Sequence, residues 1–116
     1  MTMPSHASAA TRWGTMPMAE QLAHVGSEVE RTLRAHEAGN GPRRDHALAR
    51  ALELFDLTAT DPRWRGARRR EILRAREAFC AHLFTPGPDA GPERGLRRYF
   101  LAFAVLARRS GMEAAR

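Results

Sequence analysis

The amino-acid sequence predicts an all-α fold, a four-helix, largely antiparallel bundle with a disordered N-terminal tail. Three observations predict it. Apolar residues recur at spacings of three and four along every long segment. These segments are rich in Ala, Leu, Arg and Glu, and alternating runs of β-branched residues are absent. Gly and Pro clusters separate the segments from one another.

The chain of 116 residues is long enough for one hydrophobic core and too short for two. Its hydrophobic content of 43% excludes disorder as the general state. The first dozen residues are mostly small and polar, which is typical of an unpacked end. We therefore expect a flexible tail over residues 1–14 and a single helical-bundle domain over residues 15–110.

The first helix is predicted over residues 17–38, because Pro17 suits a first turn and the run from Gly39 to Pro42 ends the helical pattern. Gly26 lies beside the apolar stripe, where its missing side chain would let a neighbouring helix approach. The stripe itself has the three-and-four spacing of a packed face and consists of Met18, Leu22, Val25, Val29 and Leu33.

The second helix is predicted over residues 43–59 and the third over residues 62–84. Asp61 followed by Pro62 is typical of an N-cap and a first helical residue. The connection is so short that the two helices should be antiparallel neighbours. The expected core residues are Leu48, Ala51, Leu52 and Phe55 in the second helix, and Ile72, Phe79, Cys80 and Leu83 in the third.

The fourth helix is predicted over residues 93–109. It follows a loop, residues 85–92, that contains three Pro and two Gly. Its apolar face comprises Leu96, Tyr99, Phe100, Phe103 and Ala107.

Cysteine content and hydropathy predict a cytoplasmic location without membrane association. Cys80 is the only cysteine and cannot form an internal disulfide. Residues 1–13 lack the apolar core of a signal peptide, and no run approaches the roughly 20 apolar residues that a membrane span needs.

A buried polar cluster is predicted around Arg76, which falls in the middle of the apolar face of the third helix. A charge cannot be buried alone at tolerable cost, so Arg76 either extends to water or meets a carboxylate. A ligand-binding arginine is the alternative to such a structural pair. We favour the structural cluster, made of Glu28, Arg31, Asp56 and Arg76.

Charge is unevenly distributed along the chain. All nineteen basic residues are arginines; residues 1–61 hold six against eight acids, and residues 62–116 hold thirteen against five. An anionic partner for the second half is one interpretation, and a solvated mixed-charge surface is the other. The residues that would contact nucleic acid are Arg63, Arg70 and Arg74, with Trp64 either as a stacking platform or as a hydrophobic plug.

Four apolar residues fall away from the predicted core faces: Leu54, Leu57, Leu101 and Val105. They predict an interface for a homodimer or a partner protein. The alternative is that their helices are buried on two sides.

No catalytic residue, metal site or cofactor is predicted. The pairs Arg31 with His36 and Arg76 with His82 fit the Arg-x(4–6)-His spacing of HEPN-type ribonucleases, but about two such matches are expected by chance. The spacings that mark zinc or di-iron sites are absent.

In combination, several stretches between Trp13 and Arg108 resemble a family of short, uncharacterised bacterial helical proteins. The stretches are residues 24–31 (HVGSEVER), 39–40 (GN), 50–58 (RALELFDLT), 61–62 (DP), 99–103 (YFLAF) and 107–108 (AR). The resemblance implies a compact all-α domain and carries over no activity or cofactor.

Taken together, these observations predict a non-enzymatic, cytosolic protein-interaction module, dimeric through its outer apolar residues. The alternative is an RNA-binding or HEPN-like ribonuclease-type protein that uses the arginines of residues 63–76.

Overall fold

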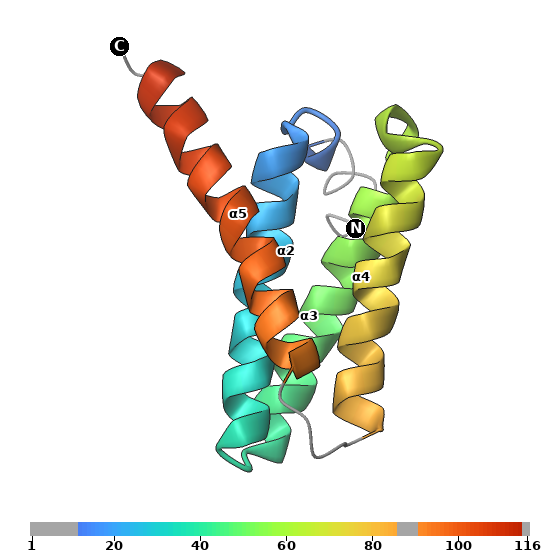
Figure 1. Cartoon of the computed structure of the whole chain (residues 1–116), viewed down its shortest axis with the longest axis vertical. Helices are drawn as coiled ribbons and strands as arrows, with labels where there is room; N and C mark the ends of the chain where they lie inside the picture. The colour runs from blue at the N-terminus through green and yellow to red at the C-terminus, as the bar shows by residue number, and fades with distance from the viewer. Residues whose placement is uncertain (1–11, 86–90, 115–116) are drawn as a thin grey trace, which may run out of the picture.

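A computed structural model describes the backbone of residues 12–85 and 91–114 and the side chains up to residue 111. Within these residues the chain is helical and has no strand, which confirms the all-α prediction. The helices are α2 (Met18–Glu37), α3 (Gly41–Ala59), α4 (Ala67–Phe84) and α5 (Gly91–Ala114), with a short 3-10 turn, η1 (Pro62–Trp64), before α4. Successive helices run in opposite directions (Figure 1).

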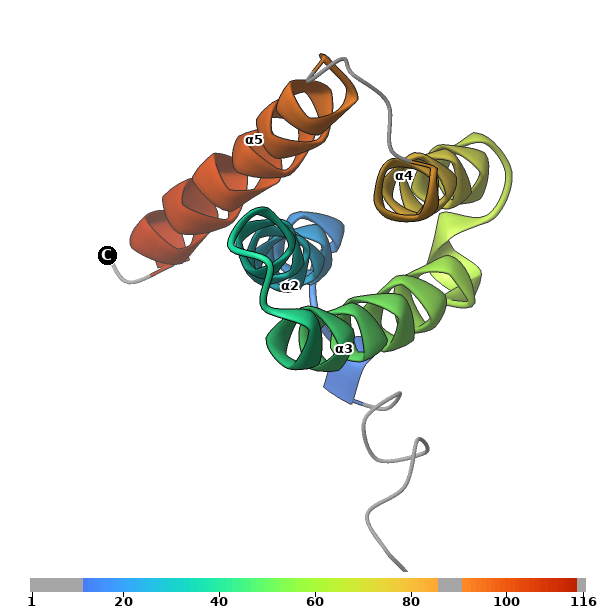
Figure 2. The ribbon, with the colours of Figure 1, turned by 90° about the horizontal axis from the view of Figure 1, so that it is seen from below.

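Helix α2 is the centre of the bundle: it packs against α3 on one side and against α5 on another, as Figure 2 shows. Helix α4 completes the bundle by packing against α3 and α5. The ring of Phe55 on α3 joins three helices, because its centroid lies 6.0 Å from that of Phe79 and 5.9 Å from that of Phe100. The predicted α2 stripe is buried from Leu22 to Leu33, while Met18 is partly buried.

The turn between α2 and α3 follows the predicted end signals. Gly39 adopts a φ of 70°, which suits a glycine after a helix end. The side chain of Asn40 then accepts a hydrogen bond from the backbone N–H of Arg43 and so caps α3. Pro42 lies in the first turn of α3, where its missing N–H costs nothing.

The third predicted helix, residues 62–84, is wrong as one continuous element. Asp61 caps only the 3-10 turn, by accepting the backbone N–H of Arg63 at 3.0 Å. Arg65 is then extended and Gly66 adopts a φ of 78°, so a new helix begins at Ala67. A positive φ at Gly66 reverses the local backbone, and an α-helix cannot continue through it.

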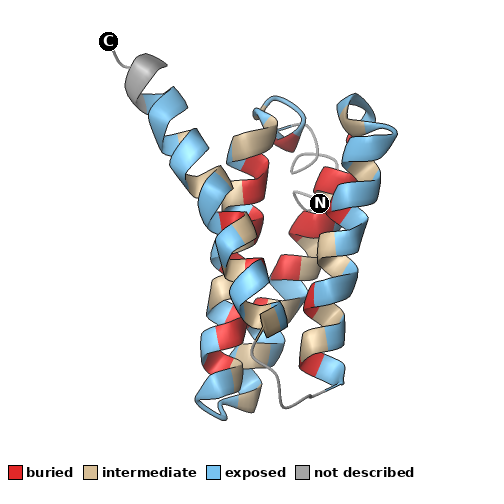
Figure 3. Ribbon diagram, in the orientation of Figure 1, coloured by how far each residue is buried: buried red, intermediate tan, exposed pale blue. Residues whose placement is uncertain are grey.

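Helix α5 is longer than predicted and begins at Gly91. Its last two buried residues are Leu96 and Phe100; none of residues 101–111 is buried. The second half therefore extends away from α2, and its described side chains, up to residue 111, are coloured as exposed or intermediate in Figure 3. The predicted tail is described only at residues 12–14, where Trp13 is buried, and residues 86–90 of the predicted loop lie outside the described residues.

Candidate functional site

A buried polar network closes the end of the bundle at which α2 begins. Gln21 is fully buried and donates to the carbonyl of Trp13 at 2.7 Å and to Asp61 Oδ2 at 3.0 Å. Its oxygen accepts from Trp64 Nε1 at 2.7 Å, while Trp13 Nε1 donates to Thr58 Oγ1 at 2.9 Å. These bonds join the segment before α2 to the turn between α3 and α4, so the network is structural.

Arg63, the first residue predicted to contact nucleic acid, belongs to this network. Its Nη2 lies 2.8 Å from Asp61 Oδ2 and 2.7 Å from the carbonyl of Met16. Hydrogen bonding by Arg63 lowers the pKa of Asp61 to about 2. The Arg63 guanidinium also lies 4.4 Å from the ring centroid of Trp64, and that of Arg68 lies 5.6 Å from it. The Trp64 ring is thus occupied within the protein, which favours the hydrophobic-plug interpretation over a stacking platform.

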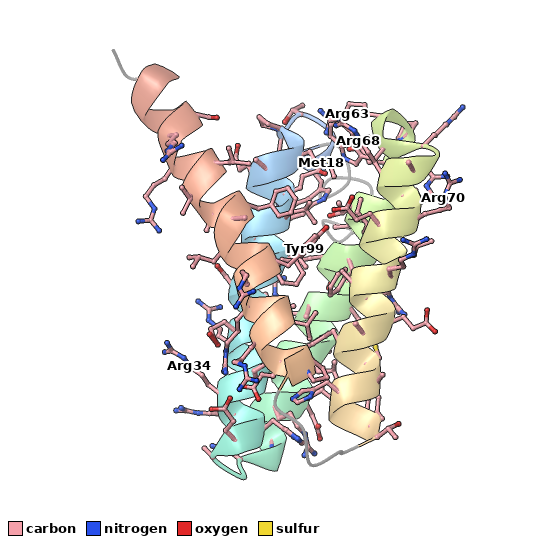
Figure 4. The ribbon with its side chains drawn as sticks, viewed as in Figure 1. Met18, Arg34, Arg63, Arg68, Arg70 and Tyr99 are labelled. Carbon is pink, nitrogen blue, oxygen red and sulfur yellow. The ribbon has the colours of Figure 1, made fainter. Side chains whose placement is uncertain are left out.

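Arg70 and Arg74, the other two, are exposed on α4 and make no ion pair within the part of the chain that the structure describes. Figure 4 shows Arg70 pointing away from the bundle, whereas Arg63 and Arg68 lie near the start of α2. The three predicted contact residues therefore do not form one patch of free guanidinium groups.

The predicted buried polar cluster is wrong as a single buried unit. Arg76 Nε lies 3.1 Å from Asp56 Oδ1, but their side chains are 34% and 62% exposed. Glu28 is buried and pairs with Arg31 at 2.7 Å, and the Arg31 side chain is 71% exposed. The long arginine side chains carry their charges to the surface, so the buried Glu28 is paired by an arginine that remains in water, and the Arg76–Asp56 pair is a separate, partly exposed contact.

An ion-pair cluster that the sequence did not predict links α2 and α5 through Arg97. Its guanidinium contacts Glu30 at 2.9 Å, Glu37 at 2.7 Å and Glu93 one turn earlier on α5. A hydrogen bond with Glu37 raises the pKa of Glu93, and the same bond lowers the pKa of Glu37. The spacing of Glu93 and Arg97 was a detectable local signal, but the α2 partners are far away in the sequence.

In neither of the two pairs with HEPN-type spacing does the arginine contact its histidine. Arg31 pairs with Glu28 and Arg76 pairs with Asp56. The two histidine rings instead lie near each other, with centroids 6.2 Å apart, and His82 Nε2 is 3.7 Å from Glu93 Oε2. Among the described residues, no hydrogen bond or ion pair joins either arginine to its histidine.

The predicted apolar interface divides into two parts. Leu54 is buried and Leu57 packs against the core, so their assignment to an outer surface is wrong. Helix α3 is covered on more than one side, by α2 and by α4. Leu101 and Val105 are 59% and 37% exposed on α5, and Leu106 beside them is 49% exposed.

Within the described ranges, no group of three or more His, Cys, Asp or Glu residues is placed to hold a metal ion. No described helix is both long and apolar enough to cross a membrane. No family model matches this chain, and no curated protein or solved structure matches it significantly. The resemblance to short bacterial helical proteins stays a prediction.

Proposed function

We propose that this chain is a non-enzymatic protein-interaction module that self-associates through the second half of α5, residues 101–109. The observation that supports this proposal is the early end of packing along α5. A helix of 24 residues is about 36 Å long. Its buried positions end at Phe100 and Phe103 still packs partly against the core, so the part of α5 after Phe103 has no buried side chain up to residue 111.

The second half of α5 exposes large apolar side chains to solvent, which is energetically unfavourable. Leu101 and Val105 are one turn apart on the outer side, and Leu106 lies next to them. Burying one such side chain fully is worth about 1.5–3 kcal/mol. A helix segment of this length is also marginal without packing, so a partner would stabilise the segment as well as cover it.

A second copy of the chain is the partner that we propose, because two such segments can cover each other about a twofold axis. The charges at the edge of this surface are Arg98, Arg108 and Arg109, and no acidic residue lies between Arg98 and Gly111. In an antiparallel pair these arginines repel one another. Salt screens that repulsion and leaves apolar burial intact, so the dimer should become tighter as salt is added.

Light scattering coupled to gel filtration, at low and high NaCl, tests the proposal. We expect a dimer that persists in high salt, and a folded monomer for the double variant Leu101→Glu with Val105→Glu. The matched control is Leu73→Glu, an apolar residue that is 45% exposed on α4, and this variant should remain dimeric. A wild-type monomer at every concentration and salt would contradict self-association.

RNA binding, the alternative prediction, has less support. Of the three residues predicted to contact nucleic acid, Arg63 is engaged within the protein, as is Trp64, and Arg70 and Arg74 are exposed. Arg70 and Arg74 lie one turn apart on α4, and two guanidinium groups alone supply a weak electrostatic contact and no base recognition. The interaction module is therefore the function that we propose.

A further inference from the structure

A groove of about 850 Å³ lies between the C-terminal half of α2 and the N-terminal half of α3. Part of its wall is apolar and made of small residues. Ala35 and Ala47 are buried at its base, and Ala38 and Pro42 line its edge. Longer side chains at these four positions would fill the space. The volume falls in the range, roughly 300–1,000 Å³, of sites that take small molecules.

Four arginines line the same groove, Arg31 and Arg34 from α2 and Arg43 and Arg50 from α3, against one acidic residue, Glu28. Arg31 is paired with Glu28, and Arg34 approaches Glu30 only at 3.9 Å. Arg43 and Arg50 are exposed, and the structure shows no ion pair for either among the residues it describes. Figure 4 shows Arg34 pointing away from α4, on the outer side of α2. The groove thus has at least two guanidinium groups without an acidic partner.

The start of α3 adds to this positive field. Asn40, the cap of α3, and Pro42 in its first turn both line the groove. The positive end of the helix dipole therefore faces the same space as the arginines. No acidic residue lies in the first turn of α3 to offset it.

We infer that this groove binds a small phosphate-bearing molecule with a flat or apolar body, of about the size of a nucleotide. Guanidinium groups bind phosphate oxygens through paired N–H donors, which Arg43 and Arg50 can supply. The alanine and proline wall suits the uncharged part of the ligand. None of the lining residues belongs to α5, so this inference is independent of the proposed dimer.

NMR titration of the ¹⁵N-labelled full chain tests the inference with three probes: AMP, which has both parts, pyrophosphate, which has the charge alone, and adenosine, which has the body alone. We expect saturable shifts confined to amides of residues 31–50. Affinity should fall in the order AMP, pyrophosphate, adenosine. Adenosine binding as tightly as AMP would overturn the phosphate assignment, as would the absence of shifts with about 10 mM AMP at low salt.

Two double variants of equal net charge distinguish a specific phosphate site from general electrostatic attraction of AMP to the protein. Arg43→Gln with Arg50→Gln should weaken AMP binding by roughly tenfold or more. Arg70→Gln with Arg74→Gln removes the same charge from exposed positions on α4 and should leave the dissociation constant within about twofold. Equal weakening by both variants would overturn the inference. If the first variant does not fold, Arg43→Lys with Arg50→Lys is used instead, because it keeps the charge but loses the paired N–H donors. This variant should still weaken AMP binding. An unchanged affinity for AMP would overturn the inference.

Discussion

The Cβ atom of Phe100 occupies the space in which a side chain on Gly26 would begin. A Cβ built on Gly26 would lie 2.7 Å from Phe100 Cβ and 3.1 Å from its Cγ. Phe100 is also the last buried residue of α5, and its ring meets that of Phe55. This close approach of two helix backbones is therefore one of the contacts that attach α5 to the bundle, and the last buried side chain of α5 lies there.

Gly26→Ala should destabilise the protein. The added methyl group cannot be accommodated at 2.7 Å from a Cβ atom, so α5 must shift. Overpacking of this kind costs about 1–3 kcal/mol, which exceeds the gain of up to about 1 kcal/mol from replacing glycine within a helix. Urea unfolding followed by circular dichroism measures the difference.

The matched control is Gly95→Ala on α5, where a Cβ would meet nothing within 4 Å. Here only the helix-propensity gain applies, so the free energy of unfolding should rise by about 0.5–1 kcal/mol. Equal effects of the two substitutions would contradict the close approach at Gly26.

The helix faces could be predicted from the sequence because they depend on local spacing. Leu22, Val25, Val29 and Leu33 follow one helical stripe and are all buried, and Gly26 beside them does meet a neighbouring helix. The cap at Asp61 is likewise a local signal, although it begins only a 3-10 turn. Such features need no knowledge of which helices are neighbours.

The candidate sites depend on how the helices are placed, and this is what the sequence could not supply. Arg97 meets Glu30 and Glu37 only because α5 packs against α2. Leu54 is covered because α3 has neighbours on more than one side. The groove between α2 and α3 likewise requires two helices whose small residues face each other. The break at Gly66 was a missed local signal, since glycine there is compatible with a positive φ.

Arg97→Gln should destabilise the protein at neutral pH, by about 1–2 kcal/mol, because it leaves three carboxylates facing one another. Attraction to Arg97 favours the charged forms of Glu37 and Glu93, so the pKa values of these two carboxyls are higher in the folded variant than in the wild type, and the variant gains stability relative to wild type as the pH falls toward about 4. In the wild type the pKa of Glu37 is lowered, so the stability that its charged form contributes is lost as the pH falls. The deficit measured by urea unfolding should therefore shrink at acidic pH.

Arg98→Gln is the control for this prediction. Arg98 is the next residue on α5, is exposed and makes no ion pair among the described residues. Its replacement should change the free energy of unfolding by less than about 0.5 kcal/mol at either pH. A pH-independent deficit for Arg97→Gln would show that its carboxylate contacts do not matter.

Asp56→Ala should have little effect, although it removes the partner of Arg76. The pair is exposed, with Asp56 at 62%, and exposed ion pairs are worth about 0–1 kcal/mol. Arg76→Met should be equally mild, and thermal unfolding at low and high salt measures both. A loss above about 3 kcal/mol for Asp56→Ala would instead indicate a buried, desolvated pair.

Asp61→Asn should remove stability that depends on pH. Asparagine caps a helical turn about as well as aspartate, so the substitution chiefly removes the charge that Arg63 contacts. The folded-state pKa of Asp61 is lowered from 3.8 to about 2, so its contribution, about 2 kcal/mol, is fully present above the unfolded value and is lost as the pH falls through about 2. Urea unfolding followed by tryptophan fluorescence should show wild type and variant converging near pH 2. Asp45→Asn is the control, because the Asp45 side chain is 68% exposed beside Arg44, and it should change the free energy of unfolding by under about 0.5 kcal/mol at every pH. A deficit for Asp61→Asn that stayed constant with pH would rule out the charged contact as its cause.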